Sequence, residues 1–167
     1  MRIGIITAFS IVCSTVGVAQ AAPPQPLLTV KVARLTLETA MKIASASIED
    51  CRKAGYSVAV TVVDHDGTAQ VSERDTLAAP VALKISLEKA FTSAMFQSSG
   101  ADLEKFPGRG ALGTADAGLL FTKGAVLINV GGFVYGAIGV SGTPSGVVDE
   151  QCAQAGLDAV SDDLAMQ

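Results

Sequence analysis

The 167-residue chain carries 12 Lys and Arg against 16 Asp and Glu, a formal net charge of −4. An acidic chain without a basic stripe is not a candidate for nucleic-acid binding. With a single His and three Cys, the chain also has little material for a zinc hydrolase or a Ser-His-Asp triad.

The first 21 residues have the three-part layout of a secretory signal peptide. Arg2 supplies a positive start, residues 3–18 hold no charge and are mostly apolar, and Ala19-Gln20-Ala21 is a small-x-small cleavage site. The apolar run is short and interrupted by Gly and Ser, so a membrane anchor is the less favoured alternative. We therefore expect a signal peptide at 1–21 and a periplasmic or secreted protein with no stable membrane insertion.

The rest of the chain has the length of one domain. Residues 22–34 are predicted to be an extended, Pro-rich lead-in to a single domain at 35–167. A helix is expected to begin after Thr36, whose hydroxyl can cap the first turn, and to end at Gly55. Apolar residues at helical spacing predict its buried stripe, which comprises Leu37, Met41, Ala44, Ile48 and Cys51.

A β-hairpin and a second helix are predicted next. Residues 57–63 are rich in β-branched side chains, residues 64–67 (Asp-His-Asp-Gly) are expected to form a type I′ turn, and residues 68–74 return. Pro80 suits the first turn of a helix. Lys84 and Glu88 are four residues apart and should pair on its surface. Its predicted buried stripe comprises Leu83, Leu87, Ala90, Phe91 and Ala94.

The last third of the chain predicts an irregular stretch, a hairpin and a helix. Residues 99–123 contain Pro107 and five Gly, and are either a functional loop or partly helical. Strands at 124–130 and 133–141 are joined at Gly131-Gly132, and a helix covers roughly 146–164. This order of elements predicts an α+β fold with a mainly antiparallel sheet and helices packed on it.

Three side chains are candidates for ligand contacts. His65 is the only imidazole and a candidate iron ligand, with an exposed turn residue as the alternative. Arg74 and Lys89 are candidate partners for carboxylates, with ordinary surface charges as the alternative.

Two further patterns favour structural explanations. Glycines in the stretch 136–142 lie inside a predicted strand, where close approach of another backbone is favoured over a phosphate-binding loop. The acidic pairs Asp149-Glu150 and Asp162-Asp163 are predicted to be solvated helix faces rather than cation sites.

Over roughly residues 35–160, the order and spacing of several motifs resemble the GlcG/HbpS-like family of haem-binding proteins. The motifs are Val62-Val63-Asp64 with Gly67, Arg74-Asp75, Lys89-Ala90, the stretch Gly136-Ala137-Ile138-Gly139-Val140-Ser141-Gly142, and Asp149-Glu150. The resemblance implies a profilin-like architecture, in which helices sandwich an antiparallel sheet, and a homo-oligomer. It also implies binding of haem or iron, for sensing, storage or slow degradation.

The resemblance further implies where haem is contacted. Many relatives carry Pro-Thr just after the second helix, in a region linked to haem contact, and this chain has Ser99-Gly100 there. Ser99 is therefore a candidate haem contact, and Arg74 or Lys89 would pair with the propionates. Because it is the only imidazole in the chain, His65 is the first candidate for the axial ligand, followed by Tyr56, Tyr135 and Met95.

Two other functions remain open from the residues alone. One is an enzyme acting on a small carboxylate or carbonyl compound, with Lys89 or Asp64 as acid–base groups. The other is a non-catalytic accessory or assembly protein. No catalytic residue can be assigned from the sequence.

Cys51 and Cys152 remain after removal of the signal peptide. Both lie on apolar helical stripes, and the profilin-like arrangement implied by the resemblance places the first and last helices on the same side of the sheet. Export permits a disulfide. We expect the two to be bonded, with a pair of buried free thiols as the alternative.

Overall fold

The computed structural model describes residues 28–166. The chain divides into Met1–Val30, of which residues 28–30 are described, and a compact unit Lys31–Gln167. The predicted signal peptide and its cleavage site lie outside the described residues. Within the described part, no helix is long and apolar enough to cross a membrane.

The compact unit contains the elements expected from the sequence, in the expected order. The strands are β1 Ala59–Asp64, β2 Ala69–Arg74, β3 Ala125–Val130 and β4 Phe133–Ser141. The helices are α1 Leu37–Lys53, α2 Val81–Phe96, α3 Gly100–Leu103, α4 Arg109–Ala115 and α5 Gly146–Ala165. The irregular stretch 99–123 is thus partly helical.

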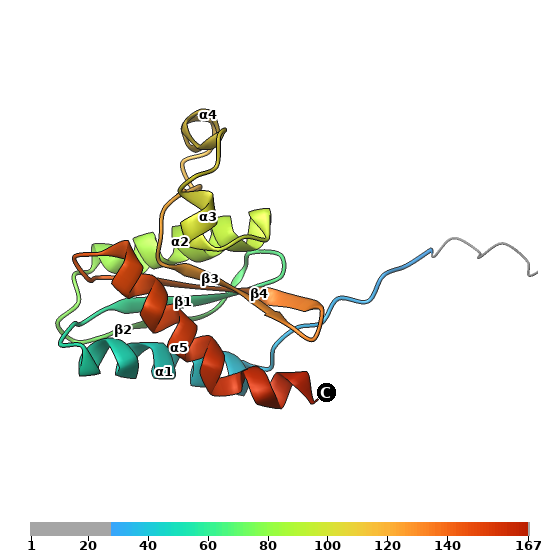
Figure 1. The fold of residues 1–167 in the computed structure, drawn as a ribbon, viewed down its shortest axis with the longest axis horizontal. Helices are drawn as coiled ribbons and strands as arrows, with labels where there is room; N and C mark the ends of the chain where they lie inside the picture. The colour runs from blue at the N-terminus through green and yellow to red at the C-terminus, as the bar shows by residue number, and fades with distance from the viewer. Residues whose placement is uncertain (1–27, 167) are drawn as a thin grey trace, which may run out of the picture. The chain divides into compact units, whose positions relative to one another are not determined.

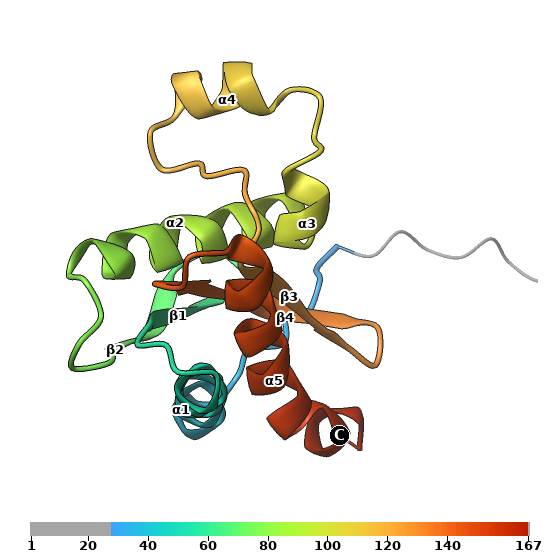
Figure 2. The same ribbon diagram turned by 60° about the vertical axis from the view of Figure 1, so that its left-hand side comes forward.

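The four strands form one antiparallel sheet in the order β2-β1-β4-β3. Helices α1 and α5 cover one face and α2 covers the other (Figures 1 and 2). The larger apolar core lies between the sheet and the α1–α5 pair, and a smaller one lies under α2. This arrangement confirms the predicted α+β, profilin-like fold.

Helix α1 begins as predicted, but its buried stripe is only partly as expected. The Thr36 hydroxyl accepts a hydrogen bond from the Thr39 N–H at 3.3 Å. Leu37 and Met41 are 55% and 48% exposed, so their predicted burial is wrong. Helix α5 approaches so closely that a Cβ at Gly156 would overlap the Ser47 hydroxyl, so the contact at this point is made by small residues. The buried face comprises Ala40, Ile43, Ala44, Ser47, Ile48 and Cys51.

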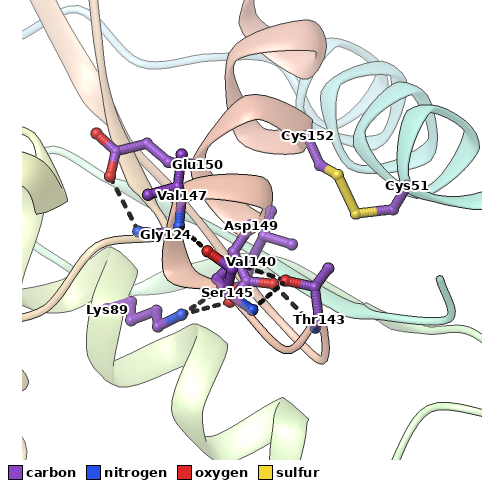
Figure 3. Close-up of polar contacts among 10 residues, drawn as sticks. All are labelled: Cys51, Lys89, Gly124, Val140, Thr143, Ser145, Val147, Asp149, Glu150 and Cys152. Carbon is purple, nitrogen blue, oxygen red and sulfur yellow. Dashed lines mark hydrogen bonds and ion pairs between the residues drawn. A yellow bond between two sulfur atoms is a disulfide. The ribbon is translucent and has the colours of Figure 1, made fainter. Parts of the chain in front are cut away.

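A disulfide joins α1 to α5. The Cα atoms of Cys51 and Cys152 lie 5.5 Å apart, within the usual range of about 4.4–6.8 Å. Both residues are at most 1% exposed. The predicted bond is confirmed, and it crosslinks the two helices that cover the main core (Figure 3).

Helix α2 lies on the sheet through small residues, so its predicted stripe is only partly right: Ala90 and Ala94 are buried as predicted, and the larger side chains are not. Leu87 is 38% exposed, and Leu83 is only half-buried. The helix backbone sits directly on β4, where a Cβ at Gly139 would overlap the Ser86 carbonyl oxygen and come within 2.7 Å of the Ala90 nitrogen. The glycines of 136–142 therefore serve close packing, as expected.

The β1–β2 turn differs from the prediction in its type. A type I′ turn needs positive φ at both central residues, but in this turn only Gly67 has one, at 78°. The turn closes through the Gly67 N–H, which donates to the Asp64 carbonyl at 2.9 Å. At the β3–β4 turn, Gly131 and Gly132 have φ values of 61° and 84°, as the predicted hairpin requires.

Candidate functional site

A groove of about 470 Å³ lies between α2, the β1–β2 turn and the segment that follows α4. We call it the hairpin groove. Its apolar walls include Leu87 and Phe91 from α2 and Ala69 from β2. Its full lining is Gly67, Ala69, Lys84, Leu87, Glu88, Phe91, Asp116 and Gly118.

The hairpin and the irregular stretch are both held close to α2 at this groove. A Cβ at Gly67 would lie 2.6 Å from the Phe91 ring and 3.0 Å from the Met95 methyl carbon, so the turn rests directly on the helix. The Thr92 hydroxyl accepts the Leu120 N–H at 2.8 Å and holds the returning chain. Lys84 and Glu88 pair at 3.6 Å on the groove side of α2, as predicted.

Beside the groove, the β1–β2 turn carries His65 within a network of charged side chains. The Arg34 guanidinium donates to the carboxylates of Asp64 and Asp66. His65 Nδ1 lies 3.6 Å from Asp66 Oδ1, and its side chain is 34% exposed. The hydrogen bond and charge of Arg34 hold the pKa of Asp66 below its usual value. Asp66 is therefore ionised at neutral pH.

A second pocket, of about 320 Å³, lies where α3, β3 and α5 meet, and we call it the α5 pocket. The Glu150 carboxylate accepts the Gly124 N–H at 3.0 Å and the Ala101 N–H at 3.3 Å. Lys123 at the rim pairs with Glu104 at 3.0 Å. The lining comprises Ser99, Ala101, Lys123, Val126, Val147, Glu150, Gln151 and Gln154.

A buried ion pair lies next to Gly124, behind this pocket (Figure 3). The Lys89 ammonium donates to Asp149 Oδ2 at 2.8 Å and to the Val140 carbonyl at 2.9 Å, with side-chain exposures of 6% and 4% for the ionic partners. Asp149 Oδ1 also accepts the Thr143 N–H at 3.1 Å. Gly124 has a φ of 108°, and a Cβ on it would overlap the Lys89 ammonium.

The prediction that both acidic pairs form solvated helix faces is wrong for the first pair. Asp149 is buried and Glu150 is half-buried, so neither forms the predicted solvated face. Both carboxylates turn toward donors from other elements, namely Lys89 of α2 and the backbone at Gly124. The second pair is exposed, as predicted, and its Asp163 contacts Lys42 at 3.2 Å.

The structure separates the predicted site residues. Ser99 lines the α5 pocket and caps α3 by accepting the Asp102 N–H at 3.3 Å. Lys89 is buried near the same pocket without lining it, and a ligand carboxylate would have to compete with Asp149 for its ammonium group. Arg74 ends the edge strand β2, lines neither pocket, and donates to the Ala78 carbonyl. His65 lines neither pocket, and it belongs to the β1–β2 turn whose Gly67 lines the hairpin groove.

Packing also accounts for the departure of the sequence at Gly100. A Cβ there would lie 2.7 Å from the Thr122 carbonyl oxygen and 2.9 Å from the Ala125 nitrogen. The Thr of many relatives is therefore not accommodated by this backbone arrangement. Ser99, the candidate replacement, lines the α5 pocket rather than the hairpin groove.

Sequence reasoning missed Arg34, Asp66 and Glu150 as parts of these sites. Arg34 lies in the predicted lead-in and contacts Asp66 of the turn, which is 32 residues further along the chain. No local sequence pattern therefore indicates the contact. Glu150 belongs to an acidic pair that resembles any helix surface. Among the described residues, no group of three or more His, Cys, Asp or Glu is placed to hold a metal ion.

Comparisons with known proteins agree with the fold. Residues 35–158 match the family model described as "Haem degrading protein HbpS-like". Protein GlcG of Escherichia coli strain K12 is 34% identical over 108 residues, which cover 64% of this chain and 81% of GlcG.

Solved structures of HbpS and of a further protein share the fold of this chain. A double mutant of Streptomyces reticuli HbpS is 32% identical, with a TM-score of 0.74 over 86% of this chain and 99% of that chain. The complex of PduOC with haem is 23% identical, with a TM-score of 0.70 over 76% of this chain and 95% of that chain, and shows a likeness of fold. From the family model and these relatives together, this chain belongs to the HbpS-like family.

Proposed function

We propose that this chain is an exported haem-binding protein, that haem occupies the hairpin groove, and that His65 is the iron ligand. The observation that carries the proposal is the apolar groove of about 470 Å³ beside the turn with the only imidazole of the chain. Family membership supports it, because the matching model names haem and a structural neighbour is a haem complex. Sensing, storage and slow degradation would all begin with this binding step.

The residues of the groove fit the chemistry of haem. Leu87 and Phe91 offer an apolar wall to the macrocycle, and the volume lies within the range of about 300–1,000 Å³ typical of ligand sites. Lys84 is 75% exposed at the groove and can pair with a propionate. An imidazole is a common protein ligand of haem iron. Bound haem would supply a redox-active iron, while these residues bind and orient it.

The α5 pocket is less suited to haem iron. Neither lining contains an imidazole, thiolate or thioether, but Gly67 of the turn that carries His65 lines the hairpin groove, and no His, Cys or Met lies within two residues of a member of the α5 pocket except the disulfide-bonded Cys152. Its one carboxylate, Glu150, already accepts two backbone N–H groups. The pocket is also the smaller of the two, at about 320 Å³. Ser99, which lines it, therefore provides a control for the location of haem.

A haemin titration of the mature protein tests this proposal. We expect a saturable Soret band, and we expect His65→Ala to shift or abolish it and to raise Kd by at least about tenfold, on the order of 1.4 kcal/mol. Ser99→Ala should leave both unchanged. If Ser99→Ala weakens binding and His65→Ala does not, haem lies in the α5 pocket. No saturable band with oxidised or reduced haem would favour the accessory-protein alternative.

Export is supported by two independent features. Residues 1–21 have the layout of a signal peptide. The Cys51–Cys152 disulfide is of a kind that persists in oxidising compartments such as the periplasm. Homo-oligomer formation stays a prediction from the family resemblance.

Cleavage after Ala21 is the expected result of export. Ala19 and Ala21 are the small residues that a signal-peptide cleavage site needs at its first and third positions. Pro23 and Pro24 follow shortly after the site. N-terminal sequencing of the protein from the periplasm or medium should therefore begin at Ala22. A mature chain that still begins at Met1 would contradict both the signal peptide and the location.

A further inference from the structure

One side of helix α2 lines the hairpin groove along its length. Lys84, Leu87, Glu88 and Phe91 are spaced i, i+3, i+4 and i+7, so they lie on the same face of the helix. At a rise of about 1.5 Å per residue, the distance along the helix from Lys84 to Phe91 is about 10 Å. The row begins at a cation and ends at an aromatic ring, so the groove has a polar end and an apolar end.

The β1–β2 turn closes the apolar end of the groove. Gly67 is buried, and a Cβ on it would lie 2.6 Å from the Phe91 ring. The polar end is open, since the side chain of Lys84 is 75% exposed. Leu87, between the two ends, is 38% exposed and offers apolar surface for a ligand to cover. A molecule in this groove would therefore place its apolar part toward Phe91 and a polar group toward Lys84.

The charges of the groove leave a place for an anion. Lys84 is the only cation among the described residues that line it, beside the carboxylates of Glu88 and Asp116. Asp116 Oδ1 accepts the Gly118 N–H at 2.8 Å. The Glu88 side chain is 18% exposed and pairs with Lys84 at 3.6 Å. Both acids thus have partners within the protein, whereas a lysine ammonium has three N–H donors and can bind a further acceptor beside Glu88.

We infer that the hairpin groove is a binding site for an apolar molecule that carries an anionic group, and that Lys84 binds this group at the open end. Glu88 holds the ammonium in the free protein and gives up this contact when the anion binds. The contact of 3.6 Å is longer than a hydrogen bond of about 2.7–3.2 Å, so the exchange costs little. The inference rests on the groove being the ligand site of the proposed function, but it requires neither iron nor His65.

Two fluorescent probes that differ by one sulfonate test this inference. Anilinonaphthalene sulfonate carries the anion, and phenylnaphthylamine has the same aromatic body without it. We expect both to bind the mature wild-type protein saturably. Lys84→Met should raise the Kd of the sulfonate by about fivefold, the upper end for a partly exposed ion pair, and that of phenylnaphthylamine by less than about twofold. Lys84→Arg keeps the charge and should stay within about twofold of the wild type.

The Glu88→Gln variant should have the opposite effect. Without the competing carboxylate, the Kd of anilinonaphthalene sulfonate should fall by about two- to fivefold, while that of phenylnaphthylamine changes by less than about twofold. A loosened fold would bind both probes more strongly, so the ratio of the two Kd values reports the anionic group alone. An unchanged ratio in both Lys84→Met and Glu88→Gln, or no saturable binding of either probe to the wild type, overturns the inference.

Lys42→Met is the matched control for Lys84→Met. Lys42 is also an exposed lysine paired with a carboxylate, at 3.2 Å from Asp163, and it lines neither pocket. Its replacement should change neither Kd. Lys123→Met tests the α5 pocket, which Lys123 lines. If the ratio changes in Lys123→Met and not in Lys84→Met, the anion lies in the α5 pocket and the inference is wrong.

Competition with haemin separates this inference from the proposed function. Haemin in the groove should displace anilinonaphthalene sulfonate from the wild type, as measured by equilibrium dialysis to avoid quenching by haem. If haemin binds and the probe stays, while Lys84→Met still weakens the probe, the proposed haem location is wrong and the inference stands. If haemin displaces the probe but neither Lys84→Met nor Glu88→Gln alters the ratio, the inference is wrong and the proposed location stands.

Discussion

Loss of the Cys51–Cys152 disulfide is expected to lower the free energy of unfolding by about 4–5 kcal/mol in the chain-entropy model. The two cysteines are separated by 101 residues, so the bond closes a long loop in the unfolded chain. Both side chains are buried between α1 and α5, and their alanine variants also leave a small cavity. Denaturant unfolding of the mature protein and of Cys51→Ala/Cys152→Ala measures the difference.

Reduced wild-type protein is the matched control for this experiment. It keeps both side chains in place, so its loss of stability reports the crosslink, and the further loss in the alanine variant reports packing. Thiol counting on the denatured, unreduced protein checks the bond itself. We expect no free thiol in the mature chain and one, Cys13, in the unprocessed chain. Two free thiols in the mature chain, or equal stability of oxidised and reduced protein, would refute the prediction.

The Lys89→Met variant is expected to lose about 3–5 kcal/mol of stability, because it leaves a buried carboxylate without its counter-ion. The side chains of Lys89 and Asp149 are 6% and 4% exposed, so water does not replace the lost partner without local opening. The contact also connects α2 to the start of α5 and to the backbone at Val140. Equilibrium unfolding of the disulfide-bonded mature protein measures the loss.

Two further variants isolate the ion pair. Lys89→Met/Asp149→Asn removes both charges, and its loss should be smaller than the sum of the single losses by more than about 1 kcal/mol. Some loss should remain, since the Val140 carbonyl no longer receives the Lys89 hydrogen bond. Lys84→Met on the same helix removes a pair whose lysine is 75% exposed and should cost at most about 0.5 kcal/mol. If Lys89→Met costs no more than Lys84→Met, the buried pair does not stabilise the fold.

The features that the sequence predicted well depend on neighbouring residues. The start of α1 follows from Thr36, whose hydroxyl reaches the Thr39 N–H within one turn. The β3–β4 hairpin follows from Gly131-Gly132, the residues that tolerate positive φ. The family resemblance then supplied the order of the layers, and with it the packing of Cys51 against Cys152.

The features that the sequence did not predict depend on how closely helices and strands approach one another in the fold. Apolar spacing correctly predicted that Ala90 of α2 is buried, but it also predicted that the helix would bury its leucines. Gly139 lets the helix backbone approach so closely that Ser86, which was not predicted, faces the sheet instead. Periodicity reports which face of a helix is apolar, and says nothing about how far away its partner lies. The same limit explains why Leu37 and Met41 were placed inside.

At the two candidate sites, too, some features follow from the sequence and others only from the tertiary structure. The sequence by itself determined that His65 is the only imidazole, that it sits in a turn, and that small residues and glycines dominate the later strands. Only the tertiary structure decided which charges meet. Arg34 reaches Asp66 across 32 residues and Lys89 reaches Asp149 across 60. Whether a charged side chain is solvated or paired depends on burial and on partners brought by other elements, and neither is a property of its local sequence.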